Sequence, residues 1–200
     1  MLSIVILVDA VAVLFDLMEF SLLKRIQRGT GFTIAEVNAS DQRQLAMGQL
    51  QLALYIGTGI AFIAWFHRSY WNITALSPEA ARYRTGWAIG AWFIPFFNLV
   101  RPKQIANDMW RGTTSPPGTV SPLVHWWWGL FVIQAGIGGA AARRAFVAET
   151  PEELISASRF LIAADISSVC AGILAVIVLV RLSRRIHARA TEIGVDAGPF

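Results

Sequence analysis

Apolar residues gather into five blocks along the chain, and basic or polar residues close most of them. Four blocks are long enough to cross a hydrocarbon layer about 30 Å thick as helices. They cover residues 2–23, 45–66, 123–142 and 158–180. Strand-like alternation of useful length does not appear in the sequence. Because helices satisfy their own backbone groups inside lipid, the pattern predicts an all-α, polytopic transmembrane helical bundle with four spans.

The fifth block, 86–100, is too short to cross as a straight helix, and Pro95 interrupts it. We interpret residues 78–100 as a broken helix that enters the membrane and turns back or lies along its surface. A surface helix over 102–111 is expected to follow, because an apolar stripe lies beside its charged residues. The alternative is a fifth span. The motif residues of this region are Trp92, Pro95, Asn98, Arg101 and Pro102.

Three short motifs predict where helices begin. Ser or Thr followed by Pro suits an N-cap and a first helical position, and helices should start near Pro78, Pro122 and Pro151. The segments between blocks predict irregular structure. These are a polar loop over 29–44, a linker over 111–122 and a flexible tail over 191–200. The rest, 1–190, is expected to form a single domain.

Composition and charge favour a multi-pass protein of the cell membrane. Hydrophobic residues make up 55% of the chain and charged residues 15%, whereas a soluble domain carries about 25% charged residues. The net charge is +4, but the basic residues cluster at block ends, which is typical of orientation signals and not of nucleic-acid binding. Their distribution predicts a cytoplasmic C-terminus with either four or five spans. We expect the first block to be a retained span, because it lacks the basic start of a signal peptide.

Acidic residues inside the predicted spans are the main candidates for chemistry. Asp9 and Asp16 are seven residues apart and share a helix face, and Asp165 lies in the last span. A carboxylate in this setting costs about 2.5–3.5 kcal/mol to insert. Four spans would bring Asp16 to the depth of Asp165, and five would bring Asp9 there. One hypothesis is a proton or cation path; the other is structural pairing with a nearby arginine, the candidates being Arg143, Arg144 and Arg159.

Four stretches resemble a bacterial family known as domain of unknown function 4328. They are "WFHR" (65–68), "RTGWAIGAWFIPFFNLVRPKQIANDMW" (84–110), "WWW" (126–128) and "LIAADISSVCAGILAVIVLVRLSRR" (161–185). The resemblance implies a multi-helix membrane domain with no established activity and supplies no catalytic residues. Similar proteins often carry a cytoplasmic N-terminal extension, which by analogy favours a cytoplasmic N-terminus and hence four spans.

Three functional hypotheses remain open. The first is a structural or partner-binding membrane module, and the alternatives are a small transporter or channel-like protein using the carboxylates and a lipid-binding protein at the broken helix. No catalytic triad spacing, phosphate-binding glycine loop or metal-ligand cluster supports an enzyme, a metal site or another cofactor. Tryptophans at block ends, with His67 and His125 beside them, are interpreted as an interfacial belt. Expected partners are lipids and a second copy or another membrane protein, packed through the small residues at 86–90 and 135–142.

Overall fold

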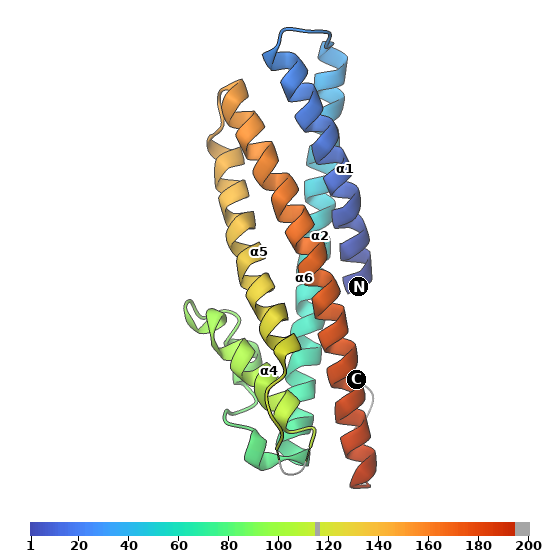
Figure 1. Ribbon diagram of the computed structural model, residues 1–200, viewed down its shortest axis with the longest axis vertical. Coiled ribbons are helices and arrows are strands. Elements are labelled where there is room, and N and C mark those ends of the chain that lie inside the picture. Colours follow the sequence, from blue (N-terminus) through green and yellow to red (C-terminus); the bar gives the residue numbers. More distant parts are fainter. Residues whose placement is uncertain (115–116, 195–200) are drawn as a thin grey trace. The chain divides into compact units, whose positions relative to one another are not determined.

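The computed structural model describes residues 1–114 and 117–194, and every regular element in these residues is helical (Figure 1). The predicted all-α class is therefore confirmed. Three helices, α2, α5 and α6, are long and apolar enough to cross a membrane. In chain order the elements are α1 (Leu2–Gln27), α2 (Ile34–Leu76), η1 (Pro78–Ala80), α3 (Trp87–Gly90), η2 (Phe97–Leu99), α4 (Arg101–Arg111), α5 (Pro122–Val147) and α6 (Pro151–Glu192), where η marks a 3-10 helix.

Reciprocal caps determine where the two longest helices begin. At the start of α2, the Glu36 N–H donates to Thr33 Oγ1 at 3.1 Å, and the Thr33 N–H donates to Glu36 Oε2 at 2.9 Å. Thr150 and Glu153 repeat this arrangement before α6, at 3.3 and 3.0 Å. Both are capping boxes. The backbone donors hold the pKa of each glutamate below its ordinary value.

The predicted helix starts at Pro122 and Pro151 are confirmed, and the predicted surface helix is present as α4. The start at Pro78 is present, but η1 ends after three residues, and the segment up to residue 100 holds only short helical turns. The polar loop predicted over 29–44 is wrong for most of its length, because the Thr33 cap already starts α2 at Ile34.

The ends of the predicted linker and tail also shift. Arg111 is the last residue of α4, and Pro122 is the first residue of α5. Within the tail, Thr191 and Glu192 are still part of α6. Residues 115–116 of the linker and 195–200 of the tail lie outside the described residues.

Two compact units divide the chain. The first comprises Met1–Gly57 and Leu130–Ile173, and therefore contains α1, the first part of α2, the second part of α5 and the first part of α6. The second comprises Thr58–Gly129 and Leu174–Phe200. Polar and small side chains occupy much of the interior of the first unit. Large side chains fill the interior of the second unit, among them Phe66, Tyr70, Ile73, Ile105, Met109, Leu182 and Ile186.

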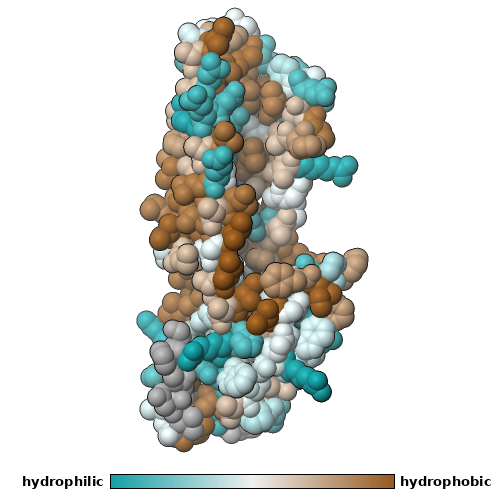
Figure 2. Space-filling model, turned by 180° about the vertical axis from the view of Figure 1, so that it is seen from behind, coloured by the Kyte–Doolittle hydropathy of each residue, from teal (hydrophilic) through white to brown (hydrophobic). Residues whose placement is uncertain are grey.

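Helix α1 shows an inverted distribution of polarity within the first unit. Asp9 and Asp16 are 1% and 4% exposed, whereas Leu7 and Leu14 are 66% and 59% exposed. Soluble proteins seldom bury acids while exposing leucines on one helix. Exposed hydrophobic side chains are also widespread on the face drawn in Figure 2. Lipid as the surrounding medium favours this distribution, because it leaves apolar side chains outside and polar ones inside.

Two tryptophans of the second unit, which were predicted to lie in an interfacial belt, are buried. Trp127 and Trp128 are buried and stack edge-on at 5.6 Å between ring centroids. Trp128 also meets Trp92 at 6.0 Å, and Trp127 meets Phe62 at 6.2 Å. The turn of α5 directs these two rings inward and leaves Trp126 exposed. An interfacial belt is therefore the wrong description of Trp127 and Trp128, which belong to the core.

Candidate functional site

Among the acids Asp9, Asp16 and Asp165 of the first unit, Asp9 accepts the most hydrogen bonds. The Ser168 hydroxyl donates to its Oδ2 at 2.6 Å, and the Tyr55 hydroxyl donates to its Oδ1 at 2.7 Å. The side-chain amide of Gln51 donates to the same Oδ1 at 3.0 Å. Helices α2 and α6 thus supply three neutral donors to one buried acid of α1, and its oxygens are satisfied.

Gln51 also joins Asp9 to Asp165, because its Nε2 donates to Oδ1 of Asp165 at 3.1 Å. Asp165 in turn interacts with Asp16. Gln44 donates to Oδ1 of Asp16 at 3.1 Å, but Oδ2 is buried and receives no hydrogen bond from a neutral or cationic donor among the described residues. The neighbouring Asp165 carboxyl can donate one only when it holds a proton.

The arginine pairing considered from the sequence is wrong for these acids. Within residues 1–114 and 117–194, no arginine or lysine forms an ion pair with Asp9, Asp16 or Asp165. Arg144 instead lies over the ring of Phe160 at 3.8 Å, and Arg159 lies over another phenylalanine ring. The depth argument also fails to choose between Asp9 and Asp16, since Asp165 interacts with both.

The sequence interpretation missed the partners on α2. Asp9 pairs with Gln51, and Asp16 pairs with Gln44. The two acids are seven residues apart on α1, the two glutamines are seven residues apart on α2, and they pair in opposite order. Antiparallel neighbours joined by a short loop produce this register, since residues seven apart share a helix face. Gln51 lies in the predicted second block, but Gln44 falls in the predicted polar loop, and its contact follows only once α2 begins at Ile34.

The broken segment of the second unit turns at the predicted place. The Phe97 N–H donates to the Pro95 carbonyl at 2.8 Å, and Phe96 between them has φ 65° and ψ −39°. A γ-turn with positive φ is rare and strained for a residue other than glycine. The turn leaves the Phe96 side chain 84% exposed. This break separates α3 from η2.

Arg101 and its neighbours hold the broken segment in place. The Arg101 guanidinium lies 4.3 Å from the ring centroid of Tyr83 and 5.4 Å from that of Phe97. The Trp128 indole N–H donates to the Leu99 carbonyl at 3.0 Å, which satisfies a carbonyl at the break. Of the other motif residues, Trp92 packs in the aromatic core, Asn98 donates its backbone N–H to Ile94, and Pro102 is buried in the first turn of α4.

A charged triad with a buried aspartate and two partly exposed arginines lies nearby in the second unit. Arg82 Nε and Arg111 Nη2 each approach Asp108 Oδ1 at 2.7 Å, and the Asp108 side chain is fully buried. The Arg82 N–H also donates to Oδ2 of this carboxylate at 3.3 Å. Two cations therefore neutralise a single acid, and they tie α4 to the segment after η1.

These elements define an all-helical protein with helices able to cross a membrane and with buried acids between them. The family model described as Domain of unknown function (DUF4328) matches residues 28–184, and the chain belongs to this family. The resemblance inferred from the sequence is thereby confirmed. No curated protein and no solved structure matches the chain.

Proposed function

We propose that the protein is a four-span protein of the bacterial plasma membrane with a cytoplasmic C-terminus. Helices α2, α5 and α6 support this by length and composition. Helix α1 supports a fourth span because its central acids are buried and its exposed face is apolar. Between 81 and 100 the longest helix has four residues, which favours four spans over five. The basic residues that follow the last span favour the cytoplasm for the C-terminus.

The side on which the N-terminus lies tests this topology. Ser3→Cys in a Cys170→Ser background gives a single labelling site, since Cys170 is the only cysteine in the chain. Four spans predict that a membrane-impermeant maleimide labels this site only after the cells are opened. Labelling of intact cells would contradict four spans.

The function that the geometry supports best is that of a small transporter or channel-like protein that carries a proton between Asp16 and Asp165. The observation behind it is the buried Asp16 Oδ2, which receives no neutral or cationic donor among the described residues and belongs to a carboxylate that interacts with Asp165. Two adjacent carboxylates repel each other strongly in a medium of low dielectric constant. A shared proton removes that repulsion and supplies the missing hydrogen bond.

Asp9 and Tyr55 complete the proposed pathway. Tyr55 is 39% exposed, and its hydroxyl donates to Asp9 at 2.7 Å. Gln51 then connects Asp9 to Asp165. The Tyr55 hydroxyl and the Asp9 carboxyl can exchange protons at the surface of the first unit, whereas the Gln51 amide donates to both acids and only positions Asp9 beside Asp165.

Proton flux into vesicles tests the proposal. The purified full chain, reconstituted in vesicles with an internal pH-sensitive dye, should dissipate an imposed pH gradient under a potassium diffusion potential. Asp165→Asn should abolish the flux, because an amide cannot accept and release the proton. Glu149→Gln, which makes the same chemical change at an exposed site of the first unit, should conduct as the wild type does. Equal dissipation by all three proteins would contradict the proposal.

The alternative is the structural or partner-binding module. Its support is an open face on α5, where a Cβ added to Gly136, Gly138 or Gly139 would meet nothing within 4 Å. Small residues of this kind let a second helix approach closely, from a second copy or another membrane protein. Wild-type vesicles without proton flux, together with a stable dimer in detergent that Gly139→Leu breaks, would favour this alternative.

A further inference from the structure

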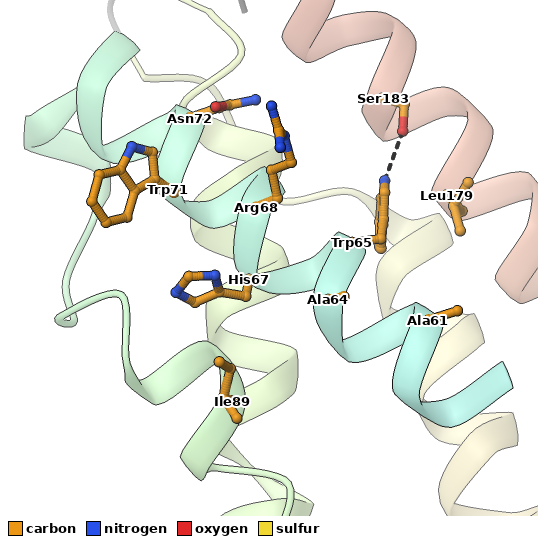
Figure 3. A pocket seen from close by; sticks show the side chains of 10 residues that line it. All are labelled: Ala61, Ala64, Trp65, His67, Arg68, Trp71, Asn72, Ile89, Leu179 and Ser183. Carbon is orange, nitrogen blue, oxygen red and sulfur yellow. Dashed lines mark hydrogen bonds between the residues drawn. The ribbon is translucent and has the colours of Figure 1, made fainter. Parts of the chain in front are cut away.

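A groove of about 1030 Å³ lies on the surface of the second unit (Figure 3). One face of α2 forms its floor, because Ala61, Ala64, Arg68 and Trp71 follow one another at helical spacing. Ile89 of α3 and two residues of α6 complete the lining. The proton pathway proposed above uses none of these residues.

The groove is divided into an apolar part and a polar part. Small and apolar side chains, Ala61, Ala64 and Leu179, line one stretch of it. At the other end Arg68 and Asn72 point toward one another in Figure 3. One stretch therefore suits hydrocarbon, while the other offers the Arg68 cation to an anionic group.

Trp65 is fixed at the boundary between the two parts. Its indole N–H donates to the Ser183 hydroxyl at 3.0 Å, so that α2 and α6 are joined beside the groove. On the far side, the His67 and Trp71 rings lie 6.4 Å apart between centroids. Tryptophan, histidine and arginine side chains that combine an apolar body with a polar tip are favoured at the boundary between hydrocarbon and headgroups.

We propose that this groove binds one anionic phospholipid, with its phosphodiester at Arg68 and an acyl chain along Ala61, Ala64 and Leu179. Charge complementarity selects the occupant, because arginine forms charge-assisted hydrogen bonds with phosphate oxygens. The small side chains of the floor leave room for a chain of methylene groups. A zwitterionic lipid would carry a compensating cation beside its phosphate and gain less from Arg68.

Native mass spectrometry of the full chain in detergent tests the proposal. The protein is offered equal amounts of phosphatidylglycerol and phosphatidylcholine with matched acyl chains. We expect one retained phosphatidylglycerol per chain, and a preference that shrinks as salt is added. Arg68→Gln should lower the preference about fivefold. Arg181→Gln, which removes the same charge from an exposed site of α6 outside the groove, should retain it.

A second variant separates the chain-binding part from the charge. Ala64 is exposed, so Ala64→Trp should fold while filling the floor, and it should retain neither lipid. Inorganic phosphate at millimolar concentration should not displace the lipid, because it lacks the acyl chain. Equal retention of the two lipids by the wild type would overturn the proposal. So would equal losses in Arg68→Gln and Arg181→Gln, or displacement of the lipid by phosphate alone.

Discussion

Two buried aspartate sites differ in what balances their charge. In the second unit, two arginines approach Asp108 Oδ1 at 2.7 Å. In the first unit, the hydrogen-bond donors to Asp9, Asp16 and Asp165 are amides and hydroxyls. Burying an unpaired carboxylate costs several kcal/mol. Two arginines balance Asp108, whereas only neutral donors among the described residues hydrogen-bond to the three acids of the first unit, and this difference separates a structural acid from a candidate functional acid.

The largest effect is expected from Asp108→Asn. It leaves two arginines without their shared carboxylate, and we expect the free energy of unfolding to fall by about 2–3 kcal/mol. Partial exposure of both arginines keeps the loss at the lower end of the range for buried pairs. Thermal unfolding in detergent, followed by circular dichroism, measures it. Asp41→Asn changes an exposed acid and should unfold as the wild type does; if Asp108→Asn did the same, the triad would not stabilise the second unit.

Gln51→Leu should have the next largest effect. It removes the donor that Asp9 and Asp165 share, and a buried acceptor that loses its partner costs about 1–3 kcal/mol. The control is Gln49→Leu, which makes the same change at an exposed position of α2 and should not destabilise the protein in detergent. Equal unfolding temperatures for both variants would show that the bridge contributes nothing to stability.

Asp165→Asn is expected to change the free energy of unfolding in the opposite direction to Asp108→Asn. The amide oxygen can still accept from Gln51, while the amide N–H can donate to Asp16 in place of the shared proton. We expect stability to stay level or rise by about 1 kcal/mol, because a buried neutral amide costs less than a buried carboxylate. The same unfolding measurement applies. A loss as large as that of Asp108→Asn would mean that Asp165 is a structural acid.

The smallest effect concerns the cap of α6. In the folded protein the pKa of the Glu153 carboxyl lies below its ordinary value, because the N–H groups of Glu149 and Thr150 donate to it. The stabilisation is therefore present above the ordinary glutamate pKa of about 4.3 and is lost as the pH falls through the folded value. Glu153→Gln should be slightly less stable than the wild type at pH 7 and equal to it near pH 3. A constant difference over this range would place the effect elsewhere.

Local signals predicted much of the fold. The Ser-Pro and Thr-Pro motifs gave the first residues of α5 and α6, and Pro95 marked the break. The start of α2 was missed because the Thr33–Glu36 capping box lies in a polar stretch, where hydrophobic periodicity carries no signal. The position of a tryptophan at the end of an apolar block also does not predict whether its ring faces inward, since this depends on packing between distant segments.

Of the candidate site, the sequence predicted only the acidic residues. Asp9, Asp16 and Asp165 stood out because charge is rare in an apolar block. Their partners Gln44 and Gln51 did not, because Gln44 falls in the predicted polar loop and a single amide is common in a span. Which donors reach an acid depends on helix register and rotation, and these follow from the three-dimensional packing of α1, α2 and α6.

Labelling by a lipid-soluble carbodiimide tests most directly whether the first unit holds an exchangeable proton. This reagent adds to protonated carboxylic acids and forms a stable N-acylurea, which peptide mass spectrometry locates. In membranes at pH 7 we predict labelling of Asp16 or Asp165, a decline as the pH is raised, and no labelling of Asp108. Labelling confined to exposed acids such as Glu149, with Asp16 and Asp165 unmodified at every pH, would contradict the account.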